Sequence, residues 1–173
     1  YSVEQERCYL GISDFGRMYF STPSVPEWTL LPGPDLYRDL TTVANVNGSS
    51  YIFRSKESCF RYSSVDHKYI NVNLLGVAVS NILCIAGFSG YLLAFTETSI
   101  AWSSLLNVVD FVPDGINGAG GGDIAEIKGE IKFVTANTFG LLIHTANNTV
   151  ACIYTGNANY PFKFVEVEGS SGG

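Results

Sequence analysis

The sequence has few charged residues, and the basic ones are the scarcer. Charged residues make up 15% of the 173 residues, and 10 Lys and Arg stand against 16 Asp and Glu, for a formal net charge of −6. A chain that is also 46% hydrophobic does not have the composition of a disordered protein. A general nucleic-acid binder needs a Lys/Arg-rich face, and no basic cluster is present to form one.

Histidine and cysteine are also scarce, with two and four residues. His144 lies in an apolar run and is predicted to be a packed core histidine, whereas His67 lies in a polar connection where we expect exposure. The cysteines show no C-x-x-C spacing and each sits in an apolar stretch, so we interpret them as small buried hydrophobic residues, with a disulfide pair as the alternative. They are Cys8, Cys59, Cys84 and Cys152.

No motif for catalysis or cofactor binding stands out. The glycine-rich run 115–123 lacks the Lys-Ser/Thr of a phosphate loop, so we predict a flexible turn that carries the chain from one repeat to the next. The oxygen-bearing side chains around it approach a calcium loop only loosely and are interpreted as solvated. A glycosidase-like carboxylate pair stays open, because such pairs form only in space. We expect no catalytic, cofactor-binding or metal-binding residues, no cofactor, and no enzyme activity.

The segment 69–96 carries no charge and could cross a bilayer by its length alone. Gly76, Gly87 and Gly90 interrupt it every few residues. An apolar segment that glycines interrupt in this way is typical of short buried strands joined by turns. We therefore expect no membrane-spanning segment.

An internal repeat is the most informative pattern. Residues 50–64 align with residues 90–104 without a gap. Tyr51 falls on Tyr91, and Tyr62 falls on Trp102. We expect Tyr51 and Tyr91 on equivalent strands of successive repeats. We expect Tyr62 and Trp102 in equivalent positions, both largely buried.

Weaker copies extend the repeat to both ends of the chain. Residues 18–22 match 100–104, and residues 140–145 begin a further copy. Each copy is an apolar run, a polar turn and a second apolar run, which predicts a β-hairpin. Another candidate strand precedes each of three hairpins, which gives three strands per repeat. A fourth, outer strand would lie between one repeat and the next. The preceding strands are 41–46, 82–86 and 131–135, and the repeats are approximately 1–40, 41–80, 81–128 and 129–173.

The sequence therefore predicts a single all-β domain over residues 1–173. Repeats of this length, each with three or four strands, favour β-propeller-like repeats of small antiparallel sheets. A β-sandwich of similar hairpins is the alternative. Four repeats are fewer than most propellers need for closure. With the start at Tyr1 and the Gly-Ser tail at 169–173, this predicts a fragment of a longer chain.

Residues 100–173 carry an order of motifs that resembles a known group. Ala101-Trp102-Ser103 comes first, a glycine-rich run and Lys128-Gly129 follow, and residues 154–162 read Tyr-Thr-Gly-Asn-Ala-Asn-Tyr-Pro-Phe. This order resembles tail-associated virion proteins of short-tailed bacteriophages, the group that contains the propeller-bearing tail nozzle proteins. The resemblance covers the C-terminal part of the chain, and the N-terminal part matches only through the internal repeat.

The resemblance implies a non-enzymatic virion component of a phage tail, a nozzle or tail-hub module made in the host cytoplasm. Its expected partners are further copies in a ring and other tail or connector proteins. DNA would pass without sequence-specific binding on its way to ejection. The alternative hypothesis is a carbohydrate-binding β module that recognises a host surface glycan through Trp28, Tyr37 and Trp102.

Overall fold

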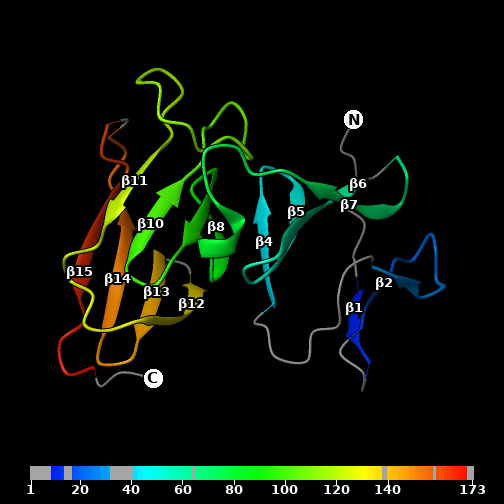
Figure 1. Cartoon of the computed structure of the whole chain (residues 1–173), viewed down its shortest axis with the longest axis horizontal. Helices are drawn as coiled ribbons and strands as arrows, with labels where there is room; N and C mark the ends of the chain where they lie inside the picture. Colours follow the sequence, from blue (N-terminus) through cyan, green and yellow to red (C-terminus); the bar gives the residue numbers. More distant parts are fainter. Residues whose placement is uncertain are drawn as a thin grey trace.

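The protein folds into four small antiparallel β-sheets with almost no helix (Figure 1). The computed structural model describes residues 9–13, 17–31, 41–63, 65–137, 140–157 and 159–170. The all-β expectation, with small antiparallel sheets in about four repeats, is confirmed.

The sheets follow one another in chain order, and each is built from consecutive strands. The N-terminal sheet contains β1 (Tyr9–Ile12), β2 (Met18–Ser21) and β3 (Thr29–Leu30). The second sheet contains β4 (Thr41–Val46), β5 (Ser49–Arg54), β6 (Ser58–Ser63) and β7 (Lys68–Val72). The third contains β8 (Cys84–Phe88), β9 (Tyr91–Phe95), β10 (Ser99–Trp102) and β11 (Gly120–Asp123). The C-terminal sheet contains β12 (Ile131–Asn137), β13 (Gly140–Thr145), β14 (Thr149–Tyr154) and β15 (Phe162–Glu166).

In the second and third sheets, a tight two-residue turn joins the first strand to the second. Asn47 and Gly48 join β4 to β5 with φ values of 49° and 78°, and Ser89 and Gly90 join β8 to β9 with 50° and 85°. Positive φ at both central residues is the type I′ hairpin turn, whose twist matches that of the strands it joins. These turns fix the register of the two sheets.

The first strands of neighbouring sheets lie side by side. β4 lies against β8, and β8 lies against β12. The Thr42 hydroxyl accepts a hydrogen bond from the Ile85 amide at 3.0 Å, and a Cβ at Gly87 would come within 2.2 Å of the Asn45 carbonyl oxygen. Adjacent first strands are typical of propeller blades around an axis. The array is open, with the N-terminal and C-terminal sheets at opposite ends (Figure 1).

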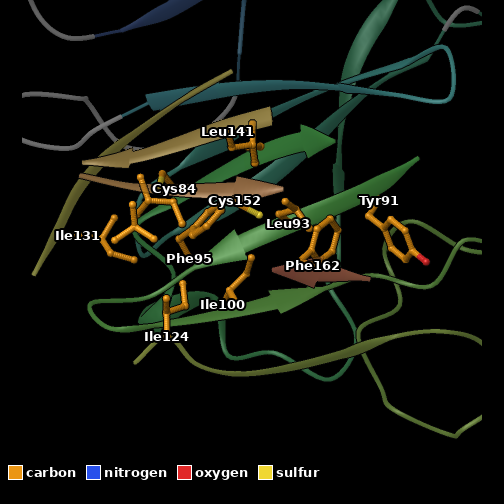
Figure 2. Packing of buried hydrophobic residues seen from close by; sticks show 13 residues of the cluster. Cys84, Tyr91, Leu93, Phe95, Ile100, Ile124, Ile131, Leu141, Cys152 and Phe162 are labelled. Atoms are coloured by element: carbon orange, nitrogen blue, oxygen red, sulfur yellow. The ribbon is translucent and has the colours of Figure 1, made fainter. Parts of the chain in front are cut away.

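Both faces of each inner sheet are buried against neighbours. We call the face turned to the following sheet the forward face and the other the backward face. On β9, Tyr91, Leu93 and Phe95 point forward into the core shared with the C-terminal sheet (Figure 2). Leu92 and Ala94 point backward into the core shared with the second sheet. This double burial explains why β9 is a continuous apolar run in the sequence.

The equivalence of the repeated aromatic residues is only partly as expected. Tyr51 and Tyr91 both lie on second strands and point forward. Tyr62 and Trp102 both lie on third strands, but they point to opposite faces. Tyr62 packs into the core of the N-terminal sheet, and Trp102 packs towards the C-terminal sheet. Both are partly buried against these cores, so it is only their expected equivalence that is wrong.

The lengths of two turns explain this correction. Arg54 pairs with Ser58 across a three-residue turn in the second sheet, whereas the Thr96 amide bonds to the Ser99 carbonyl across a two-residue turn in the third. The shorter turn shifts the third strand by one residue, and a one-residue shift reverses which face every side chain occupies. The gapless alignment of 50–64 with 90–104 therefore keeps the faces matched on the second strands and pairs side chains of opposite faces on the third.

The uncharged segment 69–96 forms the end of β7, a 3-10 turn (Val79–Asn81), β8 and β9. These are the short elements that its glycines predicted. Among the described residues, no helix has the length and apolar character needed to span a membrane.

Candidate functional site: the two uncovered end faces

Two of the motifs that carry the sequence resemblance, those of Trp102 and of residues 154–162, meet in one aromatic cluster between the third and C-terminal sheets. The Phe162 ring lies 5.7 Å from Trp102, 5.4 Å from Tyr91 and 6.1 Å from Tyr154, measured between ring centroids. The Trp102 indole nitrogen donates a hydrogen bond to the Gly118 carbonyl at 3.0 Å. These contacts join two sheets, so Trp102 is a packing residue and not an exposed platform for a sugar.

The glycine-rich run does not form the expected crossing between repeats. Gly115 and Gly118 have φ values of 75° and 74° and lie in the connection before β11. The run then continues as β11, the outer strand of the same sheet, and the chain crosses to the next sheet only afterwards. A Cβ at Gly120 would lie 2.6 Å from Trp102 Cζ2. The absence of a side chain is thus what lets β11 pair beside the indole.

The oxygen-bearing side chains of this loop hold its backbone. Asp114 Oδ1 accepts hydrogen bonds from the amides of Ile116 at 2.8 Å and Asn117 at 2.6 Å. These bonds favour the charged carboxylate and lower the pKa of Asp114. Asp110 and Asn117 make similar bonds to nearby amides. Within the described part of the chain, no cluster of three or more His, Cys, Asp or Glu side chains is placed to hold a metal ion.

Three cysteines are buried free thiols, as the sequence predicted. Burial raises the pKa of Cys59, Cys84 and Cys152 to about 12 in each case. A thiol with so high a pKa is a poor nucleophile at neutral pH. Cys8 lies outside the described residues.

Both histidines lie at surfaces. His67 is exposed, as expected, and its Nδ1 lies 3.3 Å from the Ser24 hydroxyl, which links the second sheet to the N-terminal one. His144 lies on β13, but on the forward face of the C-terminal sheet, where it is half-buried. The prediction of a packed core histidine is wrong because no described sheet follows this one to cover it.

Within the described residues, two sheet faces have no other sheet packed on them, and the forward face of the C-terminal sheet is one of these. It presents the stacked rings of Phe133 and His144, together with Ile153 and Val165, which are 43% and 39% exposed. Strand pairing places Ile153 beside Lys163 and Val165 beside Ala151, so these side chains share one side. No sequence pattern marked these residues, because they resemble buried strand residues of earlier repeats.

The backward face of the N-terminal sheet is the other uncovered face. Tyr19 pairs with both Gly11 and Leu30 on this side, while its neighbours Met18 and Phe20 point into the core. Trp28 is 56% exposed and covers Gly11, whose Cβ would lie 3.1 Å from the indole. A shallow apolar hollow is lined by Gly11, Ser13, Tyr19 and Trp28. Tyr37, also expected as an exposed aromatic, lies outside the described residues.

Comparison of the chain with protein-family models finds no match, and comparison with curated proteins finds none either.

Proposed function

We propose that this chain is a non-enzymatic structural module of a bacteriophage tail, of the nozzle or tail-hub kind. Its working form is a homo-oligomeric ring held in the virion with other tail or connector proteins. The observation that supports an assembling role is the exposure of Trp28, Leu30, Phe133 and Ile153 on end faces that no described sheet covers, because exposed apolar side chains that gather on one face can mark interaction sites. The phage setting rests on the motif resemblance over residues 100–173.

The aromatic cluster supports treating the resembling motifs as one unit. Trp102 and Phe162 belong to motifs that are far apart in the chain, and their rings lie 5.7 Å apart. The two motifs therefore belong to one packed unit of the fold.

Net charge supports the proposed path for DNA. The formal charge is −6, and Asp110, Asp114 and Asp123 line the connection through β11, the last two of them exposed. An acidic wall repels phosphate, so DNA would slide along it without sequence-specific binding. Added salt would weaken this repulsion, since the Debye length falls to about 3 Å at 1 M salt.

The protein composition and a reconstruction of the purified phage particle whose genome encodes this chain test the proposal. We expect density for the four sheets in a ring at the tail. Its absence from the particle would overturn the structural role, and a single protruding copy would overturn the ring. A ring whose acidic loops face outward would remove only the proposed DNA path.

The Trp28 hollow favours a second candidate function, recognition of a host surface glycan. An exposed indole beside Tyr19 offers the apolar platform on which a sugar ring stacks. Binding to a glycan array that is lost in Trp28→Ala and kept in Trp102→Phe would support this alternative. Equal binding by both variants would contradict it.

A further inference from the structure

We propose that a polar hollow between the second and third sheets binds an N-acetylated amino sugar through its acetamido group. The hollow has a volume of about 410 Å³. It is lined by the turn 96–99 after β9, by Ser80 and Asn81 of the segment that precedes β8, and by Lys56 of the second sheet. This site lies apart from the Trp28 hollow and goes beyond the proposed structural function. Its basis is a comparison with the next sheet, where a side chain fills the corresponding place.

The turn after the second strand has the same construction in the third and C-terminal sheets. The Thr96 amide donates to the Ser99 carbonyl at 3.0 Å, and the Ser99 amide donates to the Thr96 hydroxyl at 3.1 Å. In the C-terminal sheet, the Thr145 amide donates to the Asn148 carbonyl at 2.9 Å, and the Asn148 amide donates to the Thr145 hydroxyl at 3.0 Å. The two turns therefore correspond residue by residue, Thr96 to Thr145 and Ser99 to Asn148.

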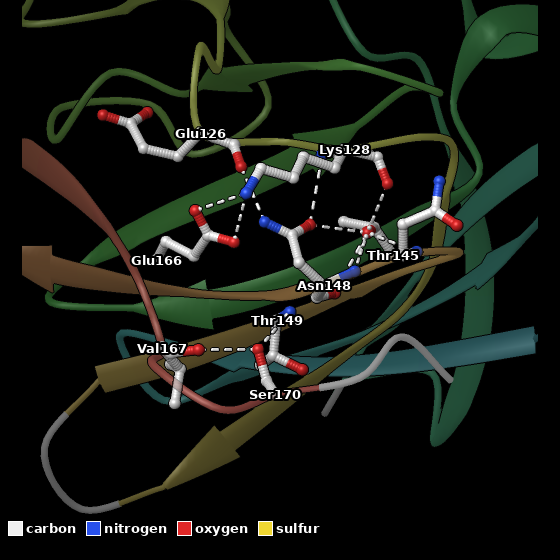
Figure 3. A network of polar contacts seen from close by, with 9 residues as sticks. Glu126, Lys128, Thr145, Asn148, Thr149, Glu166, Val167 and Ser170 are labelled. Atoms are coloured by element: carbon white, nitrogen blue, oxygen red, sulfur yellow. Dashed lines mark hydrogen bonds and ion pairs between the residues drawn. The ribbon is translucent and has the colours of Figure 1, made fainter.

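In the C-terminal sheet, the Asn148 carboxamide bridges the turn and the segment that precedes β12 (Figure 3). Its Oδ1 accepts hydrogen bonds from the Thr145 hydroxyl at 2.8 Å and the Lys128 amide at 3.1 Å. Its Nδ2 donates to the Glu126 carbonyl at 2.8 Å. Thr145 and Asn148 are 0% and 1% exposed as a result.

In the third sheet, Ser99 is too short to form this bridge. Its hydroxyl lies 2.6 Å from the Thr96 hydroxyl, and neither hydroxyl bonds to the segment 76–82, all of which the structure describes. Both residues stay partly exposed. When Thr96 donates to its partner, as Thr145 does, the Ser99 hydrogen can be donated to a ligand oxygen. The hollow thus occupies the place that a carboxamide fills in the next sheet.

An acetamido group supplies the groups that this place lacks. Like the asparagine carboxamide, it has a carbonyl oxygen that accepts and an N–H that donates, and it also carries a methyl group. An apolar recess of about 250 Å³ adjoins the hollow and shares Asn81, Thr96 and Ser99 with it. Ala78 and Ile82 are among its other lining residues. The recess can therefore take the methyl group while the amide meets the hydroxyls.

The rim of the hollow suits the hydroxyl groups of a sugar ring. Lys56 Nζ and Glu97 Oε1 lie 3.9 Å apart, and both side chains are more than half exposed. Thr98 and Ser80 add two hydroxyls to the lining. These groups donate and accept hydrogen bonds, as sugar hydroxyls do, whereas a lone amide would leave them unused. The rim therefore favours an amino sugar over a simple amide.

Titration of the whole chain with N-acetyl-D-glucosamine, followed by amide chemical shifts, tests the proposal. We expect saturable shifts at the amides of Thr96 and Ser99, with a dissociation constant on the order of 1 mM, because so small a ligand gains limited affinity. Glucose lacks the acetamido group and should bind at least about tenfold more weakly. No saturable shift at these amides, or equal binding of glucose, would overturn the proposal.

Ser99→Asn supplies the missing carboxamide from the protein itself. It should abolish the saturable shifts and slow amide exchange in the segment 76–82, because it forms the bridge that Asn148 makes in the next sheet. Ser89→Asn is the matched control, in an exposed turn at the other end of β9 where the φ of 50° suits asparagine. It should bind as the wild type does. Unchanged binding by folded Ser99→Asn would contradict the proposal.

Two further variants keep the result interpretable. Asn81→Ala leaves the turn 96–99 intact and should weaken binding by about tenfold, so it decides the question if Ser99→Asn does not fold; undiminished binding would count against the site. Trp28→Ala, which tests the glycan candidate at the N-terminal sheet, should leave the shifts unchanged, and their loss would place the sugar elsewhere. None of these results depends on whether the chain occurs in a phage particle, which tests the proposed function.

Discussion

His144 stacks on Phe133 with ring centroids 4.3 Å apart and planes 20° apart, on a sheet face that no described sheet covers. Its two ring nitrogens lie within hydrogen-bond distance of Thr135 and Thr149. Phe95 holds the same place on the third sheet and is fully buried. The residue at this position is thus apolar where a further sheet packs over it and polar where no described sheet does.

Reciprocal exchange at these two positions should have unequal effects. Phe95→His puts polar nitrogens into a sealed apolar core and should lower the free energy of unfolding by about 3 kcal/mol or more. His144→Phe removes two hydrogen bonds to threonine hydroxyls on a partly exposed face and should cost less, about 1 kcal/mol. Urea unfolding followed by fluorescence measures both. Equal losses would show that the forward face of the C-terminal sheet is as enclosed as the inner cores.

The sequence predicted the strands better than it predicted their faces. The apolar run 91–95 and the strand 41–46 are found where expected, because burial on both faces leaves a strong pattern. The opposite orientations of Tyr62 and Trp102 were missed, because they depend on one residue in a turn. An alignment of the repeats without gaps cannot detect this difference in turn length.

The candidate end faces could not be predicted for a different reason. Ile153 and Val165 are typical strand residues, and nothing local distinguishes an uncovered strand face from a covered one. Whether a face is covered depends on how many sheets the array contains and whether it closes. His144 gave a partial signal, since it replaces the phenylalanine of an earlier repeat, but a core histidine has the same local pattern.

Gly120→Ala should disturb the third sheet, whereas Gly122→Ala should not. The added Cβ at Gly120 would lie 2.6 Å from the Trp102 ring, and at Gly122 it would meet nothing within 4 Å. We expect a loss of about 1–3 kcal/mol from Gly120→Ala through overpacking, and a change within about 0.5 kcal/mol from Gly122→Ala. Thermal unfolding and the emission maximum of Trp102 provide the measurement. An unshifted emission with equal stabilities would contradict the close approach of β11 to the indole.

Asn148 fastens the crossing segment before β12 to the C-terminal sheet (Figure 3). Its Oδ1 accepts hydrogen bonds from the Lys128 amide at 3.1 Å and the Thr145 hydroxyl at 2.8 Å, and its Nδ2 donates to the Glu126 carbonyl at 2.8 Å. Asn148→Ala should lower the free energy of unfolding by about 1–3 kcal/mol, because it leaves buried polar groups without partners. Asn147→Ala, at the exposed neighbour, is the control.

Hydrogen exchange distinguishes a local effect of Asn148→Ala from a global one. We expect faster exchange at the Lys128 amide, which loses its acceptor, than at amides in β5 of the second sheet. Uniform acceleration in both places would mean that the substitution acts on global stability and that Asn148 does not hold this segment in particular.

Protonation of Asp114 should set the pH below which the loop before β11 loses its conformation. Amide hydrogen bonds from Asn117 and Ile116 lower the pKa of its carboxyl group from the usual value. A lowered folded-state pKa means that the stabilisation is fully present above the ordinary aspartate pKa of about 4 and is lost as pH falls through the lower folded-state value. Amide chemical shifts of Ile116 and Asn117 should therefore titrate together, below the midpoint of an unfolded aspartate.

Neutral substitutions at Asp114 separate its charge from its hydrogen bonds. Asp114→Asn keeps an oxygen acceptor, so the loop should hold its conformation and the titration of the neighbouring amides should disappear. Asp114→Ala removes the acceptor and should shift those amide resonances at every pH. If Asp114→Asn shifted them as far as Asp114→Ala, the charge itself would be what orders the loop. In that case, salt should loosen the loop in the wild type, since an exposed charge is screened while a short hydrogen bond to an amide is much less affected.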